Sequence, residues 1–311
     1  MIEAVGLTKR YGKTPAVNDL SFSVESGQVT GFLGPNGAGK STTMRMILGL
    51  DSPTSGRVTF GGNRYRDLKE PLRTVGALLD AKWVHPNRSA RAHLAWMAKS
   101  NRLPARRVDE VLDTVGLTSV ARKRAGGFSL GMSQRLGIAA ALLGDPEVLL
   151  FDEPVNGLDP EGILWIRKFM HRLADEGRTV FVSSHLLSEM ALTASQLIVI
   201  GRGQLISQSS TEDFVARAAE NTVKVRSPQL PRLRAVLEGA SATVVGDGSA
   251  AVVSGMDSDK IGELAAANGI VLHELSPHVG SLEQAFMQIT GDSVEYHTGP
   301  DNDVLAAPSG L

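Results

Sequence analysis

The first 220 residues combine short apolar runs with longer amphipathic stretches. The runs at 29–33, 147–151 and 179–182 are almost continuously apolar, which is typical of strands buried on both faces of a parallel sheet. Helical periodicity predicts helices at about 89–100, 105–115, 132–143, 160–176 and 187–194. This alternation of strands and helices predicts an α/β fold with a largely parallel sheet.

Other segments of this region are typical of antiparallel structure. Residues 2–33 alternate in short strands, and a turn at 51–56 precedes a further strand at 57–60. A closing hairpin is expected around residues 201–203, where two glycines flank an arginine. We therefore expect an antiparallel sub-sheet beside the parallel one.

The pattern changes after residue 220, which predicts a second domain at 221–296. Strands at 222–226, 242–245, 250–253 and 270–275 and helices at 230–238 and 260–267 follow the order βαββαβ, a small α+β unit. A further helix is expected at 281–289, and the polar tail at 297–311 is expected to be disordered. This second domain shows no catalytic motif, so we expect it to serve in dimer formation or partner docking.

The loop after the strand at 29–33 has the pattern of a phosphate-binding loop. Its glycines let successive backbone N–H groups point at phosphates, its lysine adds a positive charge, and its serine hydroxyl can ligate Mg²⁺. The loop reads Gly34-Pro35-Asn36-Gly37-Ala38-Gly39-Lys40-Ser41, with Thr42 next in the helix. It predicts a nucleoside triphosphate with Mg²⁺ as the ligand.

Polar residues follow two further strands of the predicted parallel sheet. Asp152 and Glu153 come directly after the strand at 147–151, and His185 follows the strand at 179–182. Ligands of such sheets lie at the carboxyl ends of the strands, so these side chains are expected beside the nucleotide. Asp152 suits Mg²⁺ held through water, Glu153 suits a base for the attacking water, and His185 could hydrogen-bond the γ-phosphate or that water.

The segment Phe128-Ser129-Leu130-Gly131-Met132-Ser133-Gln134-Arg135 is similar to the LSGGQxQR signature of one family. With the motifs above, residues 2–212 resemble the ATP-binding subunit of ABC transporters. The resemblance implies a P-loop ABC ATPase domain with a helical subdomain. It also implies a head-to-tail homodimer in the ATP-bound state, in which Ser129 and Gly131 of one subunit contact the γ-phosphate held by the other. P-loop kinases and GTPases, the alternative class, lack this signature.

The chain departs from the family pattern at three positions. Leu130 stands where the first signature glycine is usual, and Met132 stands where glutamine is usual. Asp80 stands at the place of the Q-loop glutamine, where it could accept a hydrogen bond from metal-bound water but could not donate one. Asp80 is therefore either a metal-site residue or a simple loop carboxylate.

Two other segments match the family. Residues 156–159, which end in Asp159, resemble the D-loop that runs along the dimer seam. Tyr11 resembles the aromatic residue of the A-loop, whose ring offers a flat face for adenine. Stacking is tolerant of the base, so the resemblance alone implies ATP as the nucleotide.

Composition limits where the chain can act. The 311 residues are 42% hydrophobic and 21% charged, with no cysteine, and no apolar run approaches the roughly 20 residues that span a bilayer. The start lacks the pattern of a secretion signal. We therefore expect a cytoplasmic protein, peripheral on the inner face of the cell membrane, with a separate integral membrane permease as its partner.

Charge is unevenly distributed along the chain. Residues 60–124 hold fourteen Lys and Arg against six Asp and Glu, a local charge of +8 in a chain of net charge −1. A basic surface facing the permease and an anionic leaflet would explain this, and a solvated helical face is the alternative. Nucleic acid is not expected as a partner, because the stretch lacks the interleaved aromatic residues that stack on bases.

The resemblance is greatest to the ABC-2-type drug and antibiotic exporters, including daunorubicin- and lantibiotic-type systems. It implies an ATPase that powers export through the permease. The alternatives are an ATPase subunit of a solute importer and a soluble ABC ATPase acting on the ribosome or DNA.

Overall fold

The computed structural model describes the chain except residues 82, 219–221, 247 and 279–311. A six-stranded sheet has the strand order β5-β6-β7-β3-β8-β9. All neighbouring pairs are parallel except β8 and β9, so this is the mixed parallel sheet that the sequence predicts. Its strands are β3 (Gln28–Leu33), β5 (Val75–Leu78), β6 (Val148–Phe151), β7 (Thr179–Ser184), β8 (Gln196–Gly201) and β9 (Gln204–Ser210).

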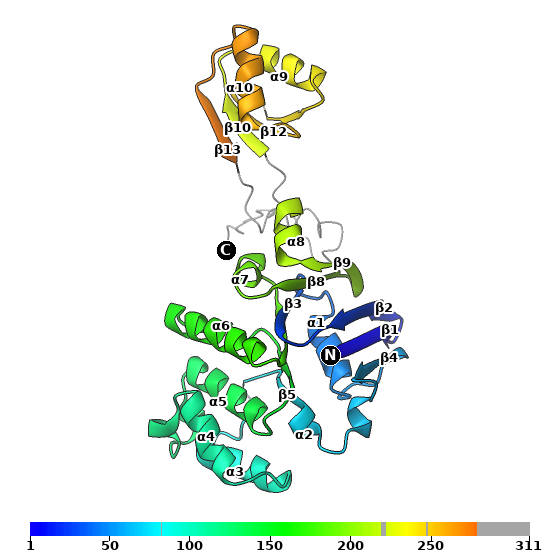
Figure 1. The fold of residues 1–311 in the computed structure, drawn as a ribbon, viewed down its shortest axis with the longest axis vertical. Coiled ribbons are helices and arrows are strands. Elements are labelled where there is room, and N and C mark those ends of the chain that lie inside the picture. The colour runs from blue at the N-terminus through cyan, green and yellow to red at the C-terminus, as the bar shows by residue number, and fades with distance from the viewer. Residues whose placement is uncertain (82, 219–221, 247, 279–311) are drawn as a thin grey trace, which may run out of the picture.

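The sheet separates two hydrophobic cores, because successive strand residues point to opposite faces. In β6, Leu149 and Phe151 join one core, while Val148 and Leu150 join the other. Figure 1 shows helices α3 to α6 on one side of the sheet and α1 with the antiparallel strands on the other. The helices are α1 (Lys40–Ile47), α3 (Ala90–Ser100), α4 (Arg106–Thr114), α5 (Leu130–Leu142) and α6 (Pro160–Asp175).

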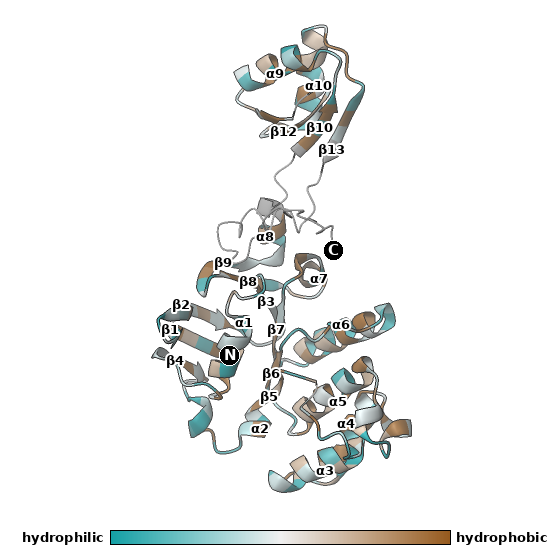
Figure 2. Cartoon of the chain, turned by 180° about the vertical axis from the view of Figure 1, so that it is seen from behind, coloured by the Kyte–Doolittle hydropathy of each residue, from teal (hydrophilic) through white to brown (hydrophobic). Residues whose placement is uncertain are grey.

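The antiparallel sub-sheet has the order β2-β1-β4. Its strands are β1 (Ile2–Tyr11), β2 (Thr14–Val24) and β4 (Ser55–Phe60). The first two have 10 and 11 residues, longer than the short strands expected from the sequence. Figure 2 shows the hydrophobic colour along the inner strands β6 and β7 and a more mixed pattern along β1.

The helices differ from the predictions mainly at their ends. Helix α5 begins at Leu130, two residues before the predicted start, because the Ser129 side chain accepts a hydrogen bond from the Met132 N–H and caps the helix. The remaining short helices are α2 (Pro71–Thr74), α7 (Leu187–Ala191) and α8 (Thr211–Ala218). Helix α7 is shorter than the predicted helix at 187–194, and α8 was not predicted.

The C-terminal unit has the predicted order βαββαβ. Its four strands pair antiparallel in the order β11-β12-β10-β13, and its helices cover a core of their own. Figure 1 shows this unit beyond α8. Its elements are β10 (Thr222–Arg226), α9 (Leu230–Gly239), β11 (Thr243–Val245), β12 (Ala250–Ser254), α10 (Ser258–Ala267) and β13 (Glu274–His278).

The last strand lies later in the sequence than predicted. Residues 270–275 were expected to form it, but the Ile270 N–H bonds to the Ala265 carbonyl and closes the end of α10. The buried Ile270 side chain packs in the core of this unit, and pairing with β10 begins at Glu274. The expected helix at 281–289 and the expected disordered tail at 297–311 lie outside the described residues.

Candidate functional site

The phosphate-binding loop joins the central strand β3 to helix α1. Gly39 has a φ of 100°, and a β-carbon at this position would lie 2.6 Å from the Ala16 carbonyl oxygen. Only glycine fits this close approach and this left-handed backbone. Gly39 is also the N-cap of α1 and provides no side-chain cap, so the helix presents backbone N–H groups toward the loop.

Lys40 is buried in the loop, with only 6% of its surface exposed. Its Nζ atom donates to the carbonyl oxygens of Gly34 at 2.7 Å and Pro35 at 3.3 Å, and lies 3.4 Å from Glu153 Oε1. Burial lowers the pKa of Lys40, and the Glu153 carboxylate opposes that shift. The ammonium group is therefore held inside the loop by acceptors that phosphate oxygens could replace.

Glu153 lies where the end of β6 meets the end of β7. His185 Nδ1 is 2.9 Å from Glu153 Oε2, and the Glu153 N–H donates to Ser183 Oγ at 2.9 Å. Glu153 has a φ of 47°, a left-handed conformation that costs a non-glycine residue about 1–3 kcal/mol. Two neighbouring strands therefore fix both the backbone and the side chain of this carboxylate.

Asp152 is held by the same serine. Ser183 Oγ donates a short hydrogen bond to Asp152 Oδ1, and the Asp152 N–H donates to the Leu78 carbonyl at 2.8 Å. Ser183 therefore serves both acids of this strand end, a role that the sequence analysis missed. A small hydroxyl residue at the end of the next parallel strand was the available signal.

These elements enclose a pocket of about 330 Å³. It brings together most of the predicted phosphate loop with Glu153 and His185. It adds Ala16, which was not predicted, and Asn156, which was predicted only as part of the D-loop segment. The lining residues are Ala16, Pro35, Asn36, Gly37, Gly39, Lys40, Ser41, Thr42, Glu153, Asn156 and His185. Two predicted loop residues are not in this lining: Gly34, whose carbonyl oxygen accepts from Lys40 Nζ, and Ala38, which is buried.

The donors for a divalent cation are the Ser41 hydroxyl and the Asp152 carboxylate, both hard oxygen ligands that suit Mg²⁺. Over the described part of the chain, no group of three or more His, Cys, Asp or Glu could hold a metal ion. Such a two-ligand set fits a cation that also binds substrate phosphates. Asp80, the third predicted ligand, is exposed two residues after β5 and does not line this pocket.

Tyr11 also lies outside the pocket lining. It ends β1 with 53% of its surface exposed, and its hydroxyl donates to Asp51 Oδ2 at 3.2 Å. Its ring therefore has room to stack against a planar group.

The signature segment and the D-loop segment contact each other. A β-carbon on Gly131 would lie 3.4 Å from Leu158 Cδ2, and Asp159 caps helix α6 by accepting from the Gly162 N–H at 2.9 Å. Ser129 caps α5, and its hydroxyl hydrogen remains available for an acceptor. In this chain Ser129, Gly131 and Asp159 do not line the phosphate pocket.

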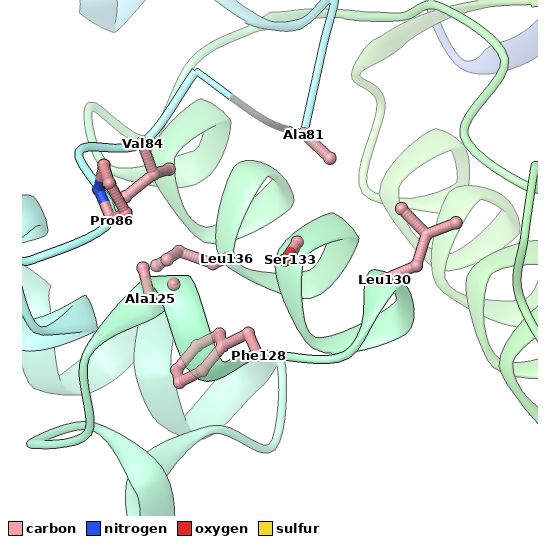
Figure 3. Close-up of a pocket in the computed structure, with 9 residues that line it drawn as sticks. Ala81, Val84, Pro86, Ala125, Phe128, Leu130, Ser133 and Leu136 are labelled. Atoms are coloured by element: carbon pink, nitrogen blue, oxygen red, sulfur yellow. The ribbon is translucent and has the colours of Figure 1, made fainter.

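A second, largely apolar pocket of about 410 Å³ lies beside the signature. Figure 3 shows side chains from the segment after β5 facing those of the signature segment and helix α5. Its lining residues are Ala81, Val84, Pro86, Ala125, Gly126, Phe128, Leu130, Ser133 and Leu136.

None of the helices in the described ranges meets both the length and the hydropathy that a membrane span needs.

The fold, the phosphate loop after β3 and the two acids that follow β6 define a P-loop ATPase. A model of the ABC transporter family matches residues 17–156, and a domain of unknown function, DUF8746, matches residues 221–283. The bacitracin transport ATP-binding protein BcrA of Bacillus licheniformis is 38% identical over 94% of this chain and 97% of its own length. The lantibiotic transport ATP-binding protein SrtF of Streptococcus pyogenes is 36% identical over 66% of this chain and 89% of its own length.

Solved structures of ABC transporter ATPases have the same fold as this chain. An ATP-binding subunit of an ABC transporter has a TM-score of 0.63 and 26% identity, and covers 70% of this chain and 92% of its own. A dimeric bacterial ABC transporter cassette, MJ0796, has a TM-score of 0.62 and 24% identity, and covers 68% of this chain and 99% of its own. The chain belongs to the family of ATP-binding subunits of ABC transporters, and it is an ATPase coupled to transport.

Proposed function

We propose that this ATPase powers the export of antibiotics through a separate integral membrane permease. The observation that carries the proposal is the 38% identity to a bacitracin transport protein along 97% of that protein's length, which includes the C-terminal unit. The lantibiotic relative supports the same cargo class. These relatives do not favour the solute importer or the ribosome- and DNA-directed alternatives.

In the proposed reaction, the loop N–H groups and Lys40 bind the β- and γ-phosphates of ATP. Ser41 and Asp152 would hold Mg²⁺, which neutralises phosphate charge when it is bound. Glu153 accepts a proton from the attacking water, and His185, 2.9 Å from its carboxylate, orients that carboxylate and the water. Asp80 would approach this site only if the segment after β5 moves when nucleotide binds.

Hydrolysis in this proposal requires a homodimer in the ATP-bound state. Ser129 and Gly131 lie at the start of α5 and do not line the phosphate pocket of their own chain. They are therefore suited to donate to the γ-phosphate of a second copy, aided by the positive end of the helix dipole. The solved cassette MJ0796, which has the same fold, is itself dimeric.

The permease would dock at the apolar pocket beside the signature. This pocket joins the segment after β5 to the start of α5, so a docked helix could affect the nucleotide site through both. Exposed basic residues of the stretch 60–124 would then face an anionic cytoplasmic leaflet, with the chain peripheral on its inner face. We assign residues 221–296 to partner or dimer contacts.

The test first identifies the permease as the membrane protein that co-purifies with this chain. The chain and that permease are then expressed together. In a host sensitive to bacitracin or a lantibiotic, the pair should raise the inhibitory concentration, and Glu153→Gln should abolish that protection while the complex still assembles. Glu153→Gln preserves shape but removes the base, a loss of about 10²–10⁴ in rate. Unchanged antibiotic sensitivity despite an active ATPase would contradict export.

A further inference from the structure

An exposed tyrosine at the end of β1 is anchored to the helix that follows the phosphate loop. The Tyr11 hydroxyl donates to Asp51 Oδ2 at 3.2 Å. The same carboxylate accepts from Arg45 twice, from Nε to Oδ2 at 2.8 Å and from Nη2 to Oδ1 at 3.2 Å. Asp51 therefore connects the Tyr11 hydroxyl to the planar guanidinium of Arg45. A bidentate pair of this kind fixes the orientation of the carboxylate as well as its position.

Arg45 belongs to the last turn of α1, the helix that begins with Lys40 of the phosphate loop. The backbone strengthens the link, because the N–H groups of Leu50 and Asp51 both donate to the Arg45 carbonyl, at 2.9 and 3.3 Å. Asp51 is therefore fixed to α1 through its main chain and its side chain. The position of the Tyr11 ring is thus set relative to the element that holds the phosphates.

Lys9 occupies one face of the same ring. Its Nζ atom is 5.1 Å from the Tyr11 ring centroid, and it donates to the Ser52 carbonyl at 2.8 Å. A cation held over one face of an aromatic ring leaves the opposite face for a flat ligand group. Arg45 also lowers the pKa of Asp51, so the carboxylate stays charged and able to accept from the phenol.

We propose that Asp51, held by Arg45, is a positioning residue that fixes the Tyr11 ring for stacking on the base of the bound nucleotide. The inference rests on the proposed function, in which ATP occupies the phosphate loop. Without the anchor, a ring that is 53% exposed would sample several rotamers and would have to be ordered when the nucleotide binds. Asp51 then contributes to recognition of the base and makes no contact with phosphate.

The test separates the base from the phosphates by comparing two probes, MgATP and magnesium tripolyphosphate, on the full chain. We expect Asp51→Ala and Tyr11→Phe each to weaken MgATP binding by roughly three- to tenfold, the range for losing one ordering hydrogen bond. Tripolyphosphate binding should not change. The double variant should lose no more than either single one, and Tyr11→Ala should lose more.

Asp67→Ala is the matched control, because it removes the same charge from an exposed pair with Arg66 whose Nε–Oδ1 distance is 3.8 Å. In turnover assays Asp51→Ala should raise the KM for ATP and leave kcat unchanged. Equal weakening of both probes would mean that Asp51 only supports α1, and unchanged ATP affinity in Tyr11→Phe would also overturn the inference. If Asp51→Ala fails to fold, Tyr11→Phe decides alone. A parent chain that binds neither probe would refute the proposed function itself.

Discussion

Leu130 of the signature segment packs directly over Gly157 of the D-loop segment. A β-carbon built on Gly157 would lie 1.9 Å from Leu130 Cδ2, so the leucine fills the space that any side chain at 157 would need. Leu130 replaces the usual signature glycine, and Gly157 has a φ of 72°. The leucine at position 130 therefore fits beside position 157 because residue 157 is a glycine. The signature segment and the D-loop segment pack against each other within one chain.

Gly157→Ala should consequently destabilise the chain. The clashing atom is the end of a flexible, half-exposed leucine side chain, so the packing cost lies at the low end of the range of about 1–3 kcal/mol for overpacking a core. The left-handed backbone costs alanine roughly 1–2 kcal/mol more. The free energy of unfolding, measured by chemical denaturation, should fall by the sum of these two effects. Turnover should also fall, because the D-loop segment carries Asp159 and Asn156.

The second-site change Leu130→Ala should recover the packing part of that loss and leave the backbone part. Leu130→Ala alone is the control, since a leucine that is 44% exposed should cost less than a buried one. If Gly157→Ala is equally unstable with and without Leu130→Ala, the two side chains do not compete for space.

Ser183→Ala should lower ATP turnover while ATP binding is retained. The variant removes the hydroxyl that donates to Asp152 and accepts from the Glu153 N–H, so a backbone donor loses its partner at a cost of about 1–3 kcal/mol. Steady-state ATPase rates should fall by roughly five- to 150-fold if that energy is lost from the reacting geometry.

The neighbouring Ser184→Ala is its matched control. Ser184 is equally buried, but its hydroxyl bonds only to the Leu186 backbone within the described chain. Similar turnover losses in both serine variants would argue for a general effect on β7 and against a specific role of Ser183.

His93 should make the protein less stable in mild acid. Burial and the charge of Arg88 lower the pKa of His93 from its ordinary value of 6.5, and its Nδ1 atom has no hydrogen-bond partner among the described residues. As the pH falls below 6.5 the unfolded state takes up a proton that the folded state resists, so stability is lost. His93→Leu should flatten this dependence.

Denaturation of the parent and of His93→Leu at pH 8 and at several values between 6.5 and 5 measures this directly. At pH 8 the two should have similar stability, because leucine replaces an unpaired polar group in a buried site. Parallel curves for the two proteins down to pH 5 would refute the assignment.

The basic residues of the stretch 60–124 differ in their availability. Arg91 forms an ion pair with Asp109, and Arg107 with Glu110, which reduces the charge that a membrane would meet. Arg122, Lys123 and Arg124 are exposed and make no ion pair with any described residue. Reversal of these three to Glu should weaken binding to anionic vesicles by at least about a hundredfold, at roughly 1 kcal/mol for each charge.

Sedimentation with phosphatidylserine vesicles at low and high salt measures that binding, with neutral vesicles as the control. ATP affinity should not change. Binding that survives reversal of all three charges would make this surface a solvated helical face, the alternative that the sequence left open.

The sequence predicted the parts of the site that lie in one short segment. The phosphate loop, Asp152 and Glu153 each follow an apolar strand, so local pattern and sheet topology together located them. Ser183 was missed because its role depends on which strand lies next to β6, and Asp51 was missed because it meets Tyr11 only in the folded chain.

For the fold, too, the sequence predicted features that depend on local pattern and missed features that depend on tertiary contacts. The alternation of apolar runs and helices predicted a largely parallel sheet, but it did not predict the order of the strands. The start of β13 was misplaced, because Ile270 and Leu272 are as apolar as strand residues and instead pack in the core of the C-terminal unit. Helix α5 starts earlier than the hydrophobic pattern indicates because a single serine cap decides its first turn.

The unequal support of the strands has a mechanical consequence. β3, which leads into the phosphate loop, is paired with β7 along all six residues and with β8 from Thr30 to Leu33, whereas β5 has four residues and pairs in the described sheet with β6 alone. Amide hydrogens of β3 should exchange with solvent only on global unfolding, and those of β5 should exchange through smaller openings. The helices α3 to α5 lie between β5 and β6 in the chain, so force from a permease would enter the sheet at these two strands, which β7 separates from β3 and the phosphate loop.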